Sequence, residues 1–222
     1  MNVANYFPRI RVKICGFTRK SDVVNAALLG VDAIGLVFYP PSSRCVSPDT
    51  AADIVRALPP FVTVVALFVD EESETIRDIL HQVPVDLLQF HGDESPELCG
   101  SFRVPYIKAV RMNSEVDIGE IEKRYSDARG LLLDAYHPDQ KGGTGLQFDW
   151  GLIPRKSCMP VVLAGGLNPD NVQDALDRVR PFAVDVSSGV ESGKGLKDMN
   201  KVAAFLREVQ EFDGRVDKLE RT

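Results

Sequence analysis

Two residues with titratable side chains close apolar segments of this 222-residue chain. Cys15 ends the segment at 11–15, and Asp134 directly follows the three leucines at 131–133. A thiolate can take a proton and a protonated carboxyl can give one, so the two groups can act as general base and general acid. They predict acid–base chemistry if the fold brings them to one site.

Each of these residues also has a simpler interpretation. A free cysteine is more often a small buried side chain than a catalyst, and an aspartate after a strand is often a turn or capping residue. Lys13 shares the strand face of Cys15 by the two-residue period, so it can favour the thiolate or can pair with a carboxylate inside the fold. Unless Asp134 faces the barrel mouth, desolvation beside the leucines is expected to raise the pKa of its carboxyl group and make it a proton donor.

Glycine and serine residues follow the last two apolar segments as Gly165, Gly166, Ser187 and Ser188. Backbone N–H groups in such loops can hold a phosphate without a lysine. Turn glycines and capping serines are the alternative for each loop alone. Both loops in this order favour a phosphate site.

Arg44 and His91 also follow apolar segments. A guanidinium group can hold a planar carboxylate with two parallel hydrogen bonds, whereas an exposed surface arginine is the alternative. His91 can bind a substrate or cap its own loop, and the residues alone leave both open.

Eight short apolar segments must position these residues. They are continuous rather than alternating, which is typical of parallel strands covered on both faces. Helical spacing follows Ser21, which is predicted to cap the first helix, and recurs after Pro48 and Ser73. The predicted strands are 11–15, 33–38, 62–69, 87–90, 106–111, 131–133, 161–164 and 182–186.

Strands that alternate with helices predict a parallel sheet, and eight such units can close into a (β/α)8 TIM barrel of the α/β class. An open dinucleotide-binding sheet is disfavoured because Cys-Gly-Phe-Thr at 15–18 stands where G-x-G-x-x-G would occur. Residues 1–222 are predicted to form one domain, with a core at about 11–210 and a charged tail from about Asp213. The candidates fall at strand ends, where barrels of this kind carry their active sites.

The formal net charge of −6 is spread along the chain, so a small molecule is a better expected partner than nucleic acid or a membrane. The four cysteines form no C-x-x-C pair and no metal-ligand pattern with histidine. The absence of a secretory signal and of a segment of about 20 apolar residues predicts a reduced, cytoplasmic protein. The sequence leaves the oligomeric state open between monomer and homodimer.

Six motifs occur in a fixed order: Lys-Ile-Cys-Gly at 13–16, Gly-Leu-Val-Phe-Tyr-Pro-Pro-Ser-Ser-Arg at 35–44, Gln-Phe-His-Gly-Asp-Glu at 89–94, Leu-Leu-Asp at 132–134 with Gly-Gly-Thr-Gly at 142–145, Leu-Ala-Gly-Gly-Leu-Asn-Pro at 163–169 and Asp-Val-Ser-Ser-Gly-Val-Glu at 185–191. Together they closely resemble the phosphoribosylanthranilate isomerase family over about residues 11–210. The resemblance implies an enzyme of tryptophan biosynthesis that performs an Amadori rearrangement of N-(5-phosphoribosyl)anthranilate, without a metal or an organic cofactor.

The resemblance also implies roles for single residues. Cys15 becomes the general base, Asp134 the general acid and Arg44 the ligand of the anthranilate carboxylate. His91 and Asp185 match supporting positions of the substrate site.

Backbone amides at 165–166 and 187–188 are expected to bind the phosphate. The loop at 142–145, with Gly143 and Thr144, is expected to close over the substrate. Two departures from the family pattern occur: Ser-Gly-Lys-Gly at 192–195 replaces a segment that commonly holds a proline, and Phe90 stands where an aliphatic residue is frequent.

Three other functions are alternatives that fit the sequence less well. A sugar-phosphate epimerase would need histidine metal ligands on several strands, and this chain has three histidines. Indole-glycerol-phosphate synthase would depend on lysine and glutamate at strand ends. A barrel that binds a phosphosugar without turnover would keep the same loops.

Overall fold

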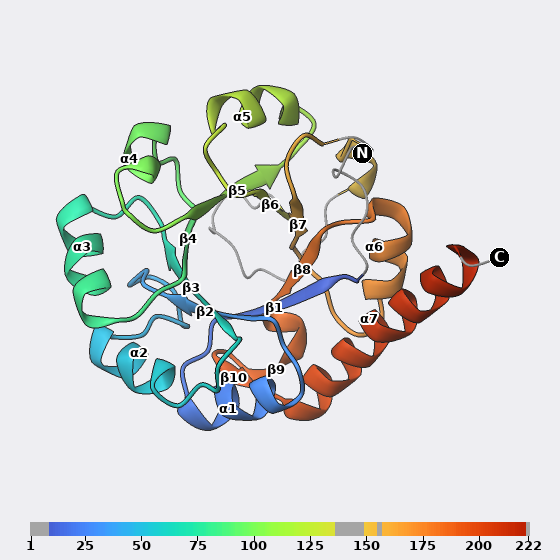
Figure 1. Ribbon diagram of the computed structural model, residues 1–222, viewed down its shortest axis with the longest axis horizontal. Coiled ribbons are helices and arrows are strands. Elements are labelled where there is room, and N and C mark those ends of the chain that lie inside the picture. Colours follow the sequence, from blue (N-terminus) through green and yellow to red (C-terminus); the bar gives the residue numbers. More distant parts are fainter. Residues whose placement is uncertain (1–8, 136–148, 155–156, 221–222) are drawn as a thin grey trace.

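Eight parallel strands form a closed barrel in the order β1 to β8, which confirms the predicted TIM barrel. The computed structural model describes residues 9–135, 149–154 and 157–220. Helices surround the ring of strands on the outside (Figure 1). The strands are β1 (Arg11–Cys15), β2 (Ala33–Val37), β3 (Thr63–Phe68), β4 (Leu87–Phe90), β5 (Tyr106–Met112), β6 (Leu131–Ala135), β7 (Val161–Leu163) and β8 (Ala183–Val186).

The helices cover the outer face of the barrel. The last one, α7, lies against α6 and α1 at the end of the chain (Figure 1). Two short 3-10 turns, η2 (Trp150–Leu152) and η3 (Ser188–Val190), lie in the connections. The α-helices are α1 (Lys20–Leu28), α2 (Pro48–Val55), α3 (Ser73–Gln82), α4 (Pro96–Gly100), α5 (Ile118–Arg124), α6 (Val172–Val179) and α7 (Met199–Glu220).

The side chains of β6 alternate between two apolar clusters. Leu132 packs inside the barrel with Ala109 and Val162, whereas Leu131 and Leu133 pack in a separate cluster with Ile118 of α5. Successive side chains of a strand point to opposite faces. Asp134 therefore points into the barrel, one layer beyond Leu132.

The start of α1 differs from the prediction. The N-cap residue is Arg19, so Ser21 lies inside the first turn and the expected Ser21 cap is wrong. The Arg19 guanidinium donates to the buried carboxylate of Asp22 at 2.8 and 3.0 Å, and this carboxylate also accepts the N–H of Lys197 at 3.2 Å. Side-chain pairing, rather than a serine cap, fixes this end of the helix.

A small antiparallel hairpin follows β8, where the sequence departs from the family pattern. It consists of β9 (Glu191–Gly193) and β10 (Leu196–Lys197). Gly195 forms its turn with a φ of +77°, a conformation that favours glycine, and its carbonyl accepts the Thr18 hydroxyl at 2.6 Å. The hairpin is thereby tied to the loop after β1.

Phe90, the second departure, is fully buried outside the barrel. Its ring stacks on Phe102, with 5.9 Å between centroids, and meets Tyr106 edge to face at 5.7 Å. At the end of the chain, α7 continues past Asp213, whose carboxylate accepts the N–H of Ile10 at 3.0 Å. No described helix is long and apolar enough to cross a membrane.

Candidate active site

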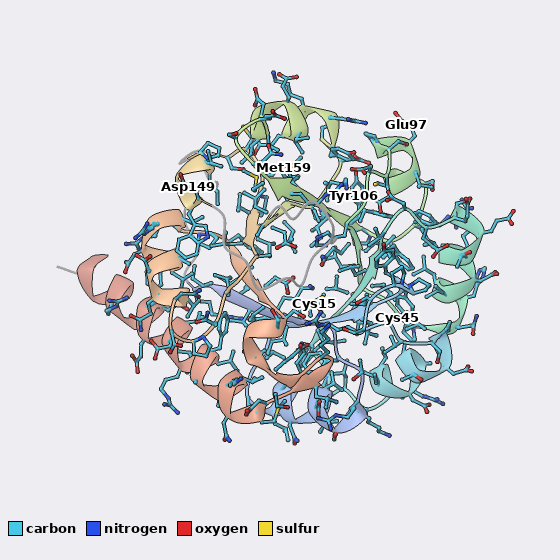
Figure 2. All side chains as sticks on the ribbon, turned by 180° about the vertical axis from the view of Figure 1, so that it is seen from behind. Cys15, Cys45, Glu97, Tyr106, Asp149 and Met159 are labelled. Carbon is cyan, nitrogen blue, oxygen red and sulfur yellow. The ribbon has the colours of Figure 1, made fainter. Side chains whose placement is uncertain are left out.

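One cavity at the carboxyl ends of the strands collects nearly every predicted site residue. Figure 2 shows Cys15 toward the middle of the ring of strands, whereas Glu97 lies at the outer edge. Gly143 and Thr144 fall outside the described residues. The lining of the cavity includes Cys15, Arg44, His91, Asp134, Gly165, Gly166, Asp185, Ser187 and Ser188, together with Val37, Tyr39, Ser42, Leu67, Gln89, Ala164, Leu167 and Val186.

Cys15 is the last residue of β1, and its side chain is buried in this cavity. Burial raises the pKa of the thiol, while the positive charges of Lys13 and Lys197 oppose this rise and the carboxylate of Asp185 adds to it. A Cβ atom on Gly35 of β2 would lie 2.7 Å from the Cys15 sulfur and 3.1 Å from the Lys13 ammonium nitrogen. Gly35 therefore makes room for both groups.

Lys13 and Asp185 form an ion pair inside the barrel, with 3.0 Å between Nζ and Oδ2. Both side chains are buried, so both sequence-based interpretations of Lys13 hold: it pairs with a carboxylate and its charge also acts on Cys15. Burial raises the pKa of Asp185, and Lys13 opposes that effect. Asp185 Oδ1 is buried and has no hydrogen-bond partner within the described part of the chain.

Asp134 is held by two contacts at the end of β6. Its Oδ1 accepts the N–H of Ala135 at 2.8 Å, and its Oδ2 lies 3.2 Å from His91 Nε2. The other ring nitrogen of His91 lies 2.9 Å from Gln89 Nε2. If the Gln89 amide donates there, His91 carries its proton on Nε2 and donates to Asp134. The chain Gln89, His91, Asp134 thus fixes the carboxylate in the cavity.

Gly165 and Gly166 follow β7 with φ values of +87° and +67°. A Cβ on Gly165 would lie 2.6 Å from the Ala135 nitrogen and 3.0 Å from Asp134 Oδ1. Left-handed backbone and close approach both require glycine here. After β8, the Ser187 hydroxyl donates to the Cys15 carbonyl at 3.0 Å, so this loop is attached directly to the strand that carries the thiol.

Arg44 reaches the cavity from the loop after β2. Its Nε and Nη2 each donate to the Glu191 carboxylate at 2.8 Å, and both side chains are largely buried. The sequence predicts that the Arg44 guanidinium makes two parallel hydrogen bonds to a substrate carboxylate. In the structure, two such bonds go to the carboxylate of Glu191 instead. A Cβ on Gly16 would lie 2.4 Å from Arg44 Cδ, so Gly16, with a φ of +81°, leaves space for the arginine stem.

No role was assigned from the sequence to Gln89, which lines the cavity, or to Gly35, Glu191 and Lys197, which contact or make room for residues that line it. Gln89 had a usable signal, because it is two residues before His91 and strand alternation puts both on one face. Glu191 and Lys197 belong to the hairpin after β8, which no periodicity predicts. Among the described residues, no group of three metal-ligating side chains comes together.

Comparisons with known proteins show the family of this chain. Residues 12–208 match the family described as N-(5'phosphoribosyl)anthranilate (PRA) isomerase. The N-(5'-phosphoribosyl)anthranilate isomerase of Nitrosococcus oceani is 56% identical over 201 residues, which cover 90% of this chain and 98% of the relative. The crystal structure of the Thermotoga maritima phosphoribosyl anthranilate isomerase matches with a TM-score of 0.84 and 44% identity, over 91% of this chain and 99% of that one.

A further solved structure contains a ligand. It is a phosphoribosyl anthranilate isomerase in complex with reduced 1-(o-carboxyphenylamino)-1-deoxyribulose 5-phosphate, with a TM-score of 0.81 and 43% identity over 91% of this chain and 99% of that one.

Proposed function

The chain belongs to the N-(5'-phosphoribosyl)anthranilate isomerase family, and from that premise we propose how its residues divide the work. The enzyme converts N-(5-phosphoribosyl)anthranilate into 1-(2-carboxyphenylamino)-1-deoxyribulose 5-phosphate in tryptophan biosynthesis. Asp134 is the general acid and Cys15 the general base. The observation that carries these roles is that both side chains are buried and line one cavity from separate strands.

The reaction begins at the furanose ring. Protonated Asp134 donates to the ring oxygen, the C1–O bond breaks and the substrate nitrogen forms an iminium with C1. His91 and the N–H of Ala135 hold the carboxyl group for this transfer, at 3.2 and 2.8 Å. General acid assistance of this kind contributes about 10²- to 10⁴-fold to the rate.

The base step follows from the charge that ring opening creates. A cationic iminium beside Cys15 favours the thiolate, which opposes the effect of burial on the thiol pKa. The thiolate takes the proton from C2, and the electron pair of that bond moves to form the enolamine. Tautomerisation, in which C1 gains a proton and the C2 hydroxyl loses its own, gives the ketose.

Two anchors are proposed to hold the substrate across the cavity. Backbone amides of the loops at 165–166 and 187–188 bind the phosphate, which the left-handed glycines support by letting the backbone approach a ligand. Arg44 binds the anthranilate carboxylate on its Nη1 side, since Glu191 already accepts from Nε and Nη2. Asp185 Oδ1, buried and unpartnered among the described residues, is proposed to accept a substrate hydroxyl.

The loop with Gly143 and Thr144 is proposed to cover the bound substrate, as the family resemblance implies. We infer that the enzyme acts in the cytoplasm, and four free cysteines support a reducing compartment.

Fluorescence-monitored turnover of freshly generated phosphoribosylanthranilate tests the anchors. Arg44→Met should raise KM about 10- to 100-fold, because a charge-assisted contact to substrate is lost. The control is Arg56→Met, which removes an exposed arginine paired with Asp53 on α2 and should leave KM unchanged. A loss confined to kcat in Arg44→Met would contradict the anchor role, and a wild-type protein without turnover would contradict the assignment itself.

A further inference from the structure

Lys197 is a fully buried lysine next to the site that the reaction scheme does not use. Burial lowers the pKa of its ammonium group, and the carboxylate of Glu191 opposes this effect. Lys197 lies on β10, and its side chain has 0% exposure. Its Nζ donates to Glu191 Oε1 at 2.8 Å and to the Ser187 carbonyl at 3.2 Å. The Phe17 ring centroid lies 5.8 Å from the same nitrogen. A buried ammonium needs such partners, because isolated burial of a charge is costly.

The partners of Lys197 connect the two proposed anchors. Glu191 holds Arg44, the proposed carboxylate ligand, through two hydrogen bonds of 2.8 Å. Ser187 begins the loop proposed for the phosphate and also donates its hydroxyl to the Cys15 carbonyl. Lys197 therefore bridges the arginine that meets one end of the substrate and the loop that meets the other.

The charges of this network explain why a lysine is present. Arg44 and Glu191 alone form a neutral pair, which attracts an anionic carboxylate weakly. Lys197 adds a second cation, so the three side chains together carry one net positive charge. Burial works against ionisation of Glu191, but Arg44 and Lys197 hold its pKa below the usual value. The glutamate thus stays an anion that can orient the guanidinium.

We propose that Lys197 is a positioning residue for substrate recognition: through Glu191 it fixes the Arg44 guanidinium, and it supplies the positive charge that the Arg44–Glu191 pair lacks. This inference rests on the proposed function, because Arg44 must be the ligand of the substrate carboxylate. Lys197 itself touches no substrate. Its effect should therefore depend on whether the ligand carries a carboxylate.

Two probes separate this role from a purely structural one. The first is reduced 1-(o-carboxyphenylamino)-1-deoxyribulose 5-phosphate, and the second is the same compound without its aromatic carboxyl group. Binding of each is measured by calorimetry to the wild-type protein, Lys197→Met and Lys197→Gln. The glutamine variant keeps a hydrogen-bond donor toward Glu191 but removes the charge, and it serves if the methionine variant fails to fold.

Lys201→Met is the matched control. Lys201 lies in the first turn of α7 and donates at 2.8 Å to the backbone carbonyl of Glu191, not to its carboxylate. The same substitution there removes a neighbouring ammonium without touching the charge network of Arg44. It should leave the affinity for both probes unchanged.

We expect both Lys197 variants to bind the carboxylated probe about 10- to 100-fold more weakly, since a misplaced anchor can cost on the order of 10²-fold. Their affinity for the probe without a carboxyl group should change by less than about threefold. Equal losses for both probes, or wild-type affinity for both, would overturn the proposal. If the wild-type protein binds neither probe, the proposed function fails, and the role of Lys197 fails with it.

A pH profile gives an independent readout. Cys15 is faced by Lys13 of β1, Asp185 of β8, Lys197 of β10 and Arg44, and the charge of Lys197 favours the thiolate. In Lys197→Gln, alkylation of Cys15 by iodoacetamide should accelerate at a higher pH than in the wild type, because the thiolate loses a charge that favours it. If the profile does not move, the charge of Lys197 has no effect on Cys15. That result would contradict the claim that Lys197 supplies positive charge to the site.

Discussion

Replacing Lys13 with methionine should destabilise the barrel in a way that depends on pH. Lys13 and Asp185 form a pair with 3.0 Å between Nζ and Oδ2, and their side chains are only 6% and 8% exposed. The substitution leaves the carboxylate buried without its cation. Breaking one side of a buried pair costs about 3–5 kcal/mol, which corresponds to a melting temperature lower by roughly 6–20 °C for a chain of this size.

The sign of the pH dependence follows from Asp185. Burial already raises its pKa, and loss of Lys13 removes the main opposing charge. A carboxyl whose pKa is higher in the folded than in the unfolded protein destabilises the fold as pH rises from the unfolded value, about 3.9, through the folded value. The deficit of Lys13→Met relative to the wild type should therefore be larger at pH 8 than at pH 5.5.

Urea unfolding followed by the fluorescence of the single tryptophan, Trp150, measures this deficit at both pH values. The double variant Lys13→Met/Asp185→Leu removes both charges and should be more stable than Lys13→Met alone, because an apolar pair leaves no uncompensated charge. The reasoning is refuted if Lys13→Met unfolds with the wild-type free energy at pH 8, or if the double variant is no more stable than the single one.

Three further predictions concern the cavity. Gly35→Ala should lower kcat about 10- to 100-fold, because the added Cβ would lie 2.7 Å from the Cys15 sulfur and displace it. Steady-state kinetics measures this loss, and an unchanged kcat would show that the position of Cys15 does not depend on a glycine at 35. Alkylation of Cys15 by iodoacetamide, followed by mass spectrometry of its peptide, should keep accelerating with pH beyond about 8.5, the ordinary thiol value, because burial raises the Cys15 pKa; a rate that is constant above pH 8 would contradict this rise. Gly165→Ala, which forces a Cβ to within 2.6 Å of the Ala135 nitrogen at a φ of +87°, should cost about 1–3 kcal/mol in chemical denaturation. Unchanged stability would show that the backbone can move there.

The barrel could be predicted because each strand is buried on both faces. The continuous apolar segments at 131–133 and 161–164 lie within one or two residues of β6 and β7 for that reason. The start of α1 could not be predicted from Ser21, because the pairing of Arg19 with Asp22 decides it.

The site residues that lie at the carboxyl ends of strands could be predicted from the sequence. Cys15 and Asp134 share the cavity because parallel strands bring their carboxyl ends to one edge of the barrel. The contact of Arg44 with Glu191 was not predictable: each residue ends a motif, but the motifs are 147 positions apart and only the fold brings the two side chains together. The same holds for Lys197, whose importance depends on three-dimensional charge balance rather than on its place in a motif.

The measurement that tests the acid–base pair most directly is the kcat of Cys15→Ala and Asp134→Ala, taken together with their affinity for the reduced product analogue. Cys45→Ala, which changes a half-buried free cysteine outside the cavity lining, is the control. Each catalytic variant should lose about 10²- to 10⁴-fold in kcat, while the analogue binds within about threefold of the wild type. If either variant keeps more than roughly a tenth of the wild-type kcat, or if lost binding accounts for its lost activity, Cys15 and Asp134 are not the base and acid of this enzyme.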